Sequence, residues 1–174
     1  MEGIAAALIL FASRIGDICT NPIEGEPGAP PLCRAESDFR LATPYYSIDI
    51  EAGLYVSVSG GGMAIVIQDS PWEEQRQLQM RVHSILGGPW DSDHYSQSRC
   101  VDFPFKGVRG VRCEYSPDGD VQREYVFDRG TPSSLGPLKT SVEFSIGSGG
   151  APLLPQFERM MESLEIMETE QRRG

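Results

Sequence analysis

One run of alternating side chains constrains the fold of this chain more than any other feature. From Leu138 to Ile146, every second residue is apolar or a threonine, and the residues between them are polar. Successive side chains of a β-strand point to opposite faces, so this alternation predicts a strand with one face towards a core. The glycine-rich segment 147–150 then ends the strand.

The segment from Val108 to Phe127 shows the same alternation on both sides of a turn. Its centre, Pro117-Asp118-Gly119, has residues that turns favour, because proline presets φ, aspartate bonds its own backbone and glycine accepts a positive φ. We therefore predict a hairpin with strands over 108–115 and 121–127. We expect this hairpin to be a structural part of the sheet, a role that requires no catalytic residue.

Further segments predict strands by their alternation or their apolar composition. Two of them flank Gly60-Gly61-Gly62, which predicts a bend; a phosphate-binding loop would need a following G-K-[ST] that the sequence lacks. The predicted strands are 46–51, 54–59, 63–67 and 100–105.

Two segments instead predict helices. Ser70, Pro71 and Glu73 match a helix start, as N-cap, first helical residue and capping-box partner. Gly87-Gly88-Pro89 matches the end of that helix, and a last helix is predicted from about Pro155. The side chains expected to face the core are Leu78, Val82, Ile85 and Leu86 in the first helix, and Phe157, Met160, Met161 and Leu164 in the second.

The start of the chain is an apolar segment with two interpretations. Ile4 to Ala12 is shorter than the ~20 residues that span a bilayer, and Met1-Glu2-Gly3 lacks the positive charge of a signal peptide. Apolar side chains recur at spacings typical of one helix face, which predicts a packed N-terminal helix over 1–19. A trimmed export signal is the alternative. The side chains on this face are Ile4, Leu8, Phe11, Ile15 and Ile18.

The order of these elements predicts a fold class. A chain of 174 residues is within the range of a single domain, and strands in runs, rather than in alternation with helices, favour an antiparallel sheet. We therefore predict an α+β fold: an antiparallel β-sheet with helices packed on its faces, plus the N-terminal helix. The expected parts are the helix over 1–19, a Pro/Gly-rich loop over 20–44, an α/β sandwich core over 45–167 and a charged tail over 168–174.

Charge limits the classes of partner. The chain has 25 acidic and 15 basic residues and a net charge of −10, so a nucleic acid would be repelled over most of the surface. A cationic protein would instead be attracted, and its encounter accelerated. We expect no cofactor and no transmembrane segment.

The cysteines fall into two neighbouring pairs, Cys19 with Cys33 and Cys100 with Cys113. A bridge in the first pair would close the proline-rich loop and contribute about 3 kcal/mol through loop entropy, and the second pair could join neighbouring strands. An even number of cysteines favours an oxidising compartment, yet buried free cysteines are common. The missing signal peptide favours the cytoplasm, so the compartment stays open between cytoplasm and, if an export signal was trimmed, periplasm.

The loop over residues 87–98 is the first candidate for a contact surface. Aromatic residues anchor many protein interfaces, and functional residues favour loops on rigid scaffolds. We expect Trp72, at the other end of the preceding helix, to contribute. Asp91, Asp93 and His94 could instead ligate zinc or manganese, which would support a metal-dependent hydrolase. The candidate residues of the loop are Trp90, Asp91, Asp93, His94 and Tyr95.

The order of elements, with the run GVRGVRCEYSPDGDVQREYVF…LKTSVEFSIG…FERMMESLEI, resembles the PsbP-like fold. That superfamily includes the extrinsic photosystem subunit, DcrB-like bacterial lipoproteins and a Ran-binding nuclear import factor. The likeness covers roughly residues 44 to 167, and it implies binding or assembly rather than catalysis. Similar small domains occur among bacterial immunity proteins that neutralise secreted toxins. The matching residues are Gly107, Gly110, Tyr115, Tyr125, Phe157, Ser163 and Leu164.

We therefore expect a non-enzymatic protein-binding domain, most of all an acidic immunity or inhibitor protein that neutralises a secreted bacterial toxin. The expected partner is a basic protein, either a toxin or a secreted enzyme. An envelope assembly or accessory factor of the PsbP/DcrB-like kind is the second hypothesis, which paired cysteines would favour. The metal-dependent hydrolase is the third.

Overall fold

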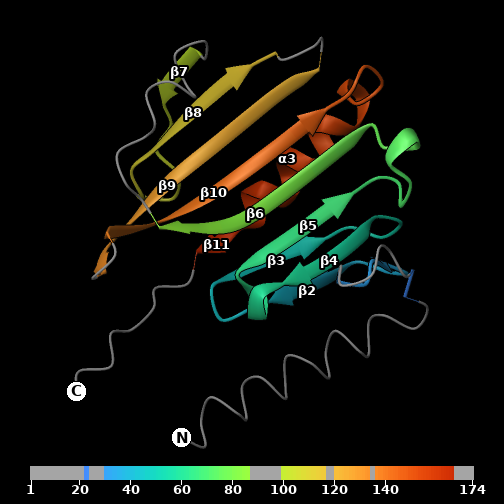
Figure 1. Ribbon diagram of the computed structural model, residues 1–174, viewed down its shortest axis with the longest axis horizontal. Helices are drawn as coiled ribbons and strands as arrows, with labels where there is room; N and C mark the ends of the chain where they lie inside the picture. Colours follow the sequence, from blue (N-terminus) through green and yellow to red (C-terminus); the bar gives the residue numbers. More distant parts are fainter. Residues whose placement is uncertain (1–21, 24–29, 87–98, 117–119, 134–135, 167–174) are drawn as a thin grey trace, which may run out of the picture. The chain divides into compact units, whose positions relative to one another are not determined.

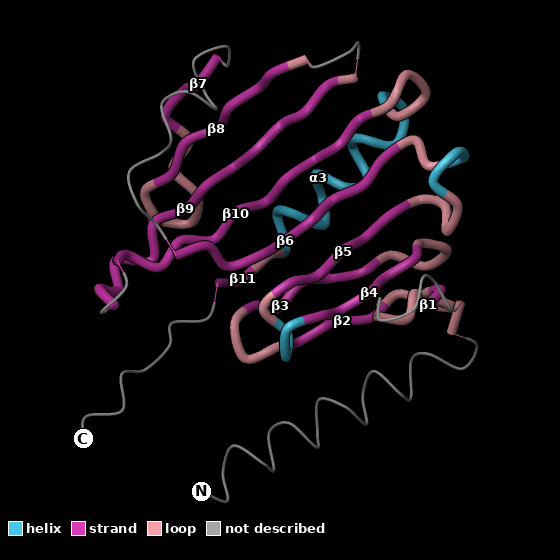
Figure 2. The backbone as a smooth tube through the Cα atoms, viewed as in Figure 1, coloured by secondary structure: helices cyan, strands magenta, loops and turns pink. Residues whose placement is uncertain are grey.

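The structure is a computed structural model that describes residues 22–23, 30–86, 99–116, 120–133 and 136–166 (Figure 1). Strands predominate, and α3 (Leu154–Ser163) is the only α-helix among these residues (Figure 2). The expected class is confirmed as a mixed α/β fold dominated by antiparallel sheets with one short helix. The helix predicted over 1–19 and the tail 168–174 lie outside the described residues.

The chain groups into two compact units. The first unit is Met1–Arg76 with Pro155–Gly174, and the second is Gln77–Leu154. The single domain and the PsbP-like sandwich stay predictions.

The first unit contains two sets of antiparallel strands. In one set the neighbours are β1, β4 and β5, and in the other they are β11, β3 and β2. Ile48 and Ile50 of β3 are almost completely buried, as their alternation predicts. The bounds are β1 Cys33–Arg34, β2 Phe39–Ala42, β3 Tyr46–Ile50, β4 Tyr55–Ser59, β5 Ala64–Gln68 and β11 Glu165–Ile166.

The bend predicted at the triple glycine is a short 3₁₀ turn, η1 (Gly60–Gly62), between β4 and β5. Gly62 has a φ of 95°, and a Cβ built on it would lie 2.8 Å from Thr43 Cβ. A larger residue would therefore meet both backbone strain and a clash, which explains the glycine at this position.

The second unit is a sheet with the strand order β6-β10-β9-β8-β7. On β10, Val142 and Phe144 are fully buried, as the alternation over 138–146 predicts. They meet a group of aromatic rings on the same face, in which Tyr125 lies 5.7 Å from Phe144 and 4.9 Å from Phe103 between centroids. The bounds are β6 Leu78–Leu86, β7 Arg99–Asp102, β8 Gly110–Tyr115, β9 Val121–Ser133 and β10 Gly136–Ile146.

Helix α3 confirms the last predicted helix, and a 3₁₀ turn, η4 (Ala151–Leu153), precedes it. Its end is bonded to β3, because Asp49 N donates to Ser163 Oγ at 2.8 Å. The apolar side chains predicted to face inward are all buried: Phe157, Met160, Met161 and Leu164.

Charged side chains join β2, β3 and β11 in a group that we name the Arg40 network. Arg40 lies 2.7 Å from Asp49 Oδ1 and 3.0 Å from Glu165 Oε2. It also donates to Ser47 Oγ at 2.8 Å. The network therefore ties three strands together through one guanidinium group.

The helix predicted over residues 70–86 is wrong. Its C-terminal half is strand β6, and a short 3₁₀ turn, η2 (Glu73–Gln75), takes the place of its start. Ser70 Oγ accepts a bond from Trp72 N at 3.3 Å, so the residue predicted as a helix cap closes a turn instead. Pairing with β10 supplies β6 with backbone bonds along its length, and this tertiary context overrides the local helix signals.

The loop predicted over 20–44 also contains strands. β1 and β2 lie within it, and an isolated bridge joins Ile23 to Leu32. These strands are short and each is held by a partner further along the chain, β4 and β3 respectively. Composition alone does not reveal such pairings.

Candidate interaction surface and polar cluster

Residues 70–76 form a surface turn, which we name the Trp72 turn. Trp72 is 55% exposed, the largest exposed fraction of the large apolar side chains described. The backbone N–H of Trp72 donates to Ser70 Oγ, and its backbone carbonyl accepts from Gln75 N at 3.1 Å. The buried side chain of Gln68 donates to Ser70 O at 2.8 Å. The turn thus presents an exposed ring on a backbone that is bonded to the interior.

Carboxylates accompany the tryptophan on this turn. Glu74 is exposed, and Glu73, whose side chain is 86% exposed, lies 3.7 Å from Arg76 Nη2. Solvent screens an ion pair at such exposure and leaves both groups hydrated. Because residues 70–76 contain two carboxylates and one arginine, the Trp72 turn combines an aromatic ring with net negative charge.

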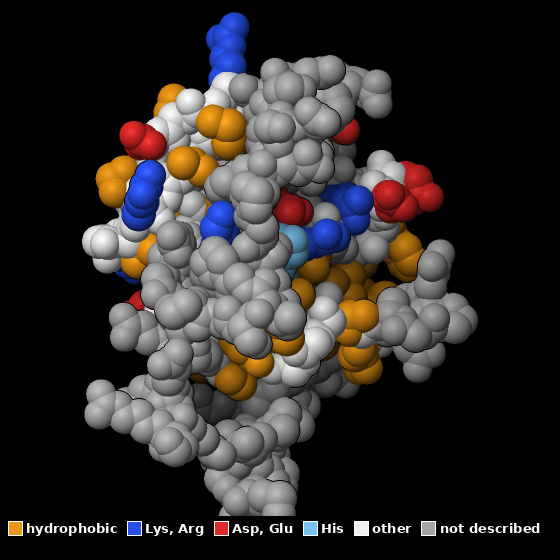
Figure 3. All heavy atoms as spheres, turned by 60° about the vertical axis from the view of Figure 1, so that its left-hand side comes forward, with side chains coloured by type: hydrophobic (Ala, Val, Ile, Leu, Met, Phe, Trp, Pro, Cys, Tyr) orange, Lys and Arg blue, Asp and Glu red, His pale blue; other side chains and the backbone are white. Residues whose placement is uncertain are grey.

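A second polar group, which we name the polar cluster, lies on one face of the sheet in the second unit. Residues opposite one another in register share a face: His83 of β6 opposes Ser141 of β10, and Glu143 of β10 opposes Glu124 of β9. On the face drawn in Figure 3, a histidine lies among acidic and basic side chains. The polar cluster consists of His83, Tyr115, Glu124, Ser141 and Glu143.

Two close contacts organise the polar cluster. Ser141 Oγ donates to Glu124 Oε1 at 2.7 Å, and both residues are buried. His83 Nε2 lies 3.0 Å from Glu143 Oε1 but makes no well-aligned hydrogen bond. This second contact is therefore an ion pair only when the imidazole is protonated.

Tyr115 of β8 is the titratable group that this environment changes most clearly. Burial raises the pKa of its phenol, and the negative charges of Glu124 and Glu143 raise that pKa further. Ionisation would add another negative charge beside two carboxylates, so Tyr115 stays protonated well into the alkaline range.

The polar cluster has residue types found in serine hydrolases but a different arrangement. A nucleophilic serine needs a base within hydrogen-bond reach and access for the substrate. Ser141 is bonded to Glu124 rather than to His83, and it is 0% exposed. The contact between Ser141 and Glu124 is therefore a buried hydrogen bond rather than the pairing of an accessible nucleophile with its base.

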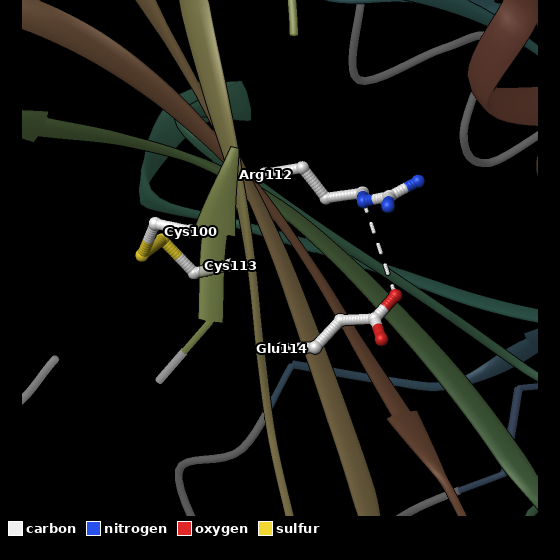
Figure 4. Close-up of a disulfide and its surroundings, with 4 residues drawn as sticks. All are labelled: Cys100, Arg112, Cys113 and Glu114. Carbon is white, nitrogen blue, oxygen red and sulfur yellow. Dashed lines mark ion pairs between the residues drawn. A yellow bond between two sulfur atoms is a disulfide. The ribbon is translucent and has the colours of Figure 1, made fainter. Parts of the chain in front are cut away.

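The predicted bridge between Cys100 and Cys113 is present (Figure 4). The cysteines are opposite one another on β7 and β8, with Cα atoms 4.1 Å apart, and Arg112 and Glu114 project from the other side of β8. Cys33 is disulfide-bonded as well; Cys19, its predicted partner, lies outside the described residues. The bridge fixes the short edge strand β7 to its neighbour.

The loop residues predicted to form the contact surface or a metal site, Trp90, Asp91, Asp93, His94 and Tyr95, lie outside the described residues. Within the described ranges, no group of three or more His, Cys, Asp or Glu side chains is placed to hold a metal ion. No helix in those ranges is long and apolar enough to cross a membrane. Of the predicted contact residues, Trp72 is described, and it is exposed as expected.

Sequence reasoning missed the polar cluster. A helix over 70–86 would place His83 near the edge of its apolar face, whereas strand β6 places it on the same face as Arg81, opposite Ser141 of β10. A signal was available, because Leu78, Met80 and Val82 are apolar at a spacing of two. The pairing of Glu124 with Ser141 depends on strand register and has no comparable signal.

No protein-family model matches this chain, and no curated protein matches it. Among solved structures, the crystal structure of a protein from Bacteroides thetaiotaomicron VPI-5482 is similar to it, with 11% sequence identity and a TM-score of 0.44. The match covers 76% of this chain and 49% of that chain, so this chain spans about half the length of that protein. A likeness of this size carries no argument about function.

Proposed function

We propose that this chain is a non-enzymatic protein-binding domain that recognises a basic protein through the Trp72 turn. The observation that carries the proposal is the 55% exposure of Trp72 on a turn bonded to the interior. Exposing a large aromatic side chain to water is unfavourable, and its burial by a partner would be correspondingly favourable.

The fixed backbone of the turn supports this role. Binding is weakened by the entropy lost when a mobile side chain or loop becomes ordered. Both backbone groups of Trp72 are hydrogen-bonded, its N–H to Ser70 Oγ and its carbonyl to Gln75 N. The carbonyl of Ser70 in turn accepts a hydrogen bond from the side chain of Gln68. The backbone of the turn is therefore already ordered in the free protein, which lowers the conformational entropy lost on binding.

Charge supports a basic partner. Glu73 and Glu74 follow Trp72 directly in the sequence, and the whole chain carries a net charge of −10. Opposite charge on a partner would accelerate association and favour the correct orientation. A secreted toxin or enzyme neutralised by an acidic immunity or inhibitor protein is the partner class that we propose.

Affinity capture tests this function, with the full chain as bait in lysate and envelope extract at low and moderate salt. We expect one stoichiometric basic protein that is lost at higher salt. Trp72→Ala should weaken its binding by about 2 kcal/mol or more, roughly 30-fold in Kd. Met63→Ala removes another exposed apolar side chain of the first unit and should leave Kd unchanged. Equal Kd values for wild type and Trp72→Ala would reject the proposed surface.

The Cys100–Cys113 bridge favours a second candidate, an envelope assembly or accessory factor. Disulfides persist in oxidising compartments and are rare in the cytosol. Thiol titration of protein purified without reductant, with and without denaturant, tests the premise. Detection of free thiols in protein expressed in its native compartment would remove this candidate and leave the inhibitor proposal untouched.

A further inference from the structure

Strand β7 is the outer strand of the sheet in the second unit (Figure 1). All four of its residues, Arg99–Asp102, are exposed. Val101, at 50%, is one of three large apolar side chains that are exposed among the described residues. Within the same part of the chain, β8 is the one strand that pairs with β7. The other edge of β7 therefore combines backbone polar groups with an exposed apolar side chain.

The pairing with β8 determines which backbone groups of β7 point outward. Phe103, directly after β7, donates its N–H to Gly110 O at 3.0 Å, and bonded and non-bonded positions alternate along an antiparallel pair. Cys100, three residues earlier, is therefore at a non-bonded position. Its Cα lies 4.1 Å from that of Cys113, in keeping with the shorter spacing of such positions. The N–H and C=O groups of Cys100, and of Asp102 in the same phase, therefore point away from β8.

Two contacts hold this edge in place. The disulfide between Cys100 and Cys113 joins β7 to β8. Directly after the strand, the ring of Phe103 lies 4.9 Å from that of Tyr125 between centroids. Because the edge is already held in its extended conformation, its pairing with another strand would lose little conformational entropy.

The outward groups of β7 are complementary to those of a second copy. With Cys100 of one copy opposite Asp102 of the other, the pair exchanges two backbone hydrogen bonds, and a two-fold axis repeats it. Val101 then lies opposite Val101 of the second copy, at a non-bonded position where side chains are closest. A register that placed Asp102 opposite itself would keep one such pair and oppose two carboxylates. Hydrogen bonding and charge therefore select the register centred on Val101.

We propose that the outer edge of β7 pairs with the same edge of a second copy, in a symmetric dimer centred on Val101. An exposed edge is a template for another strand, and pairing would remove the two Val101 side chains from water. A four-residue strand buries little area, and the net charge of −10 on each copy opposes association. The dimer is therefore weak and reversible. The proposal is independent of partner binding at the Trp72 turn.

Sedimentation equilibrium of the full, oxidised chain, at concentrations up to about 1 mM, tests this inference. We expect a monomer–dimer equilibrium that salt strengthens, because salt screens the repulsion between two chains that each carry a net charge of −10. Binding of a basic protein at the Trp72 turn should instead weaken with salt, so the two associations are distinguishable. A wild-type chain that stays monomeric over this range at high salt would overturn the proposal.

Asp102→Pro tests the backbone hydrogen bonds of the dimer. Proline lacks the N–H that points outward at this position, and an edge strand tolerates proline where the N–H faces solvent. Two hydrogen bonds are lost by symmetry, so we expect the Kd of the dimer to rise about 10-fold or more. The matched control Asp102→Asn removes the charge, keeps the N–H and should dimerise as the wild type does.

Val101→Lys tests the side-chain contact, and it decides the question if Asp102→Pro fails to fold. It places two like charges at the centre of the strand pair, and Kd should again rise about 10-fold or more. The matched control Met63→Lys adds the same charge at another exposed apolar side chain, in the first unit, and should leave Kd unchanged. An unchanged urea midpoint shows that a variant is folded. A wild-type Kd in either folded test variant would overturn the proposal.

Discussion

Two polar groups in this protein have hydrogen bonds of the same length and differ in their contact with water. In the Arg40 network, Arg40 lies 2.7 Å from Asp49, and the two side chains are 39% and 56% exposed. In the polar cluster, Ser141 lies 2.7 Å from Glu124, and the two residues are 0% and 8% exposed. Distance therefore does not distinguish the groups, but burial does.

Burial determines how much folding stability is lost when one partner of a hydrogen bond is removed. In the Arg40 network, water can replace a missing partner, and salt screens the charges, so exposed pairs contribute little to stability. Glu124 is held away from water, and a carboxylate oxygen that loses its hydrogen bond there keeps much of its desolvation penalty. The neutral serine should therefore matter more than the charged arginine.

The largest expected effect is that of Ser141→Ala. Removing the hydroxyl takes a hydrogen bond from Glu124, and we expect the free energy of unfolding to fall by about 1–3 kcal/mol. Urea unfolding under non-reducing conditions measures it.

Ser145→Ala is the matched control on the same face of β10. Ser145 donates to the neutral Gln122 at 2.8 Å in a half-buried position, so we expect a loss of about 0.5–1 kcal/mol. Equal losses in the two variants would mean that burial does not separate these hydrogen bonds, and the comparison would fail.

The strand that contains Ser141 could be predicted from sequence, whereas its partner could not. Alternation over 138–146 is a local property, and the buried positions Val142 and Phe144 follow from it. The contact with Glu124 depends on the register between β9 and β10, which local sequence does not contain. The sequence thus predicts which residues share a face, and the pairing supplies their contacts.

The segment 70–86 shows how local signals mislead. Ser70, Pro71 and Glu73 suit a helix start, but they suit a turn equally well because each acts within a few residues. Trp72 is predicted as a contact residue because aromatic side chains anchor many interfaces, and it is exposed on a turn rather than on a helix. Its role in contacts stays a prediction, whereas the predicted element was wrong.

Alkaline pH tests the polar cluster by a second route, with a smaller effect because Tyr115 is only partly buried. Its folded pKa is raised above the unfolded value of about 10. Below about pH 10 the phenol is protonated in both states, so stability does not depend on its titration. As the pH rises from about 10 to the folded pKa, the unfolded state releases the proton before the folded state does, so stability falls over this window.

Tyr115→Phe should remove this part of the alkaline loss. Urea unfolding across the alkaline range measures it, together with the ultraviolet absorbance of the phenolate. Tyr55→Phe controls for the removal of a phenol from the first unit. If Tyr55→Phe and Tyr115→Phe changed the pH dependence equally, the effect would not belong to the polar cluster.

The smallest expected effect is that of Arg40→Met, which keeps the apolar stem and removes the charge. The hydrogen bond to Asp49 raises the pKa of Arg40 above its ordinary value, so the guanidinium is charged at neutral pH. Because its carboxylate partners, Asp49 and Glu165, are exposed, we expect a loss of only about 0.5–1 kcal/mol at low salt. The loss should shrink in ~1 M salt.

Salt dependence then separates the two groups most sharply. The cost of Ser141→Ala should be nearly the same at low and high salt, because its hydrogen bond is buried and the serine is neutral. Arg159→Met, which breaks another exposed pair with Glu51 at 3.2 Å, should follow Arg40→Met in size and salt response. If Arg40→Met cost as much as Ser141→Ala and resisted salt, the Arg40 network would act as one cooperative unit, and exposure would not predict the strength of polar contacts in this fold.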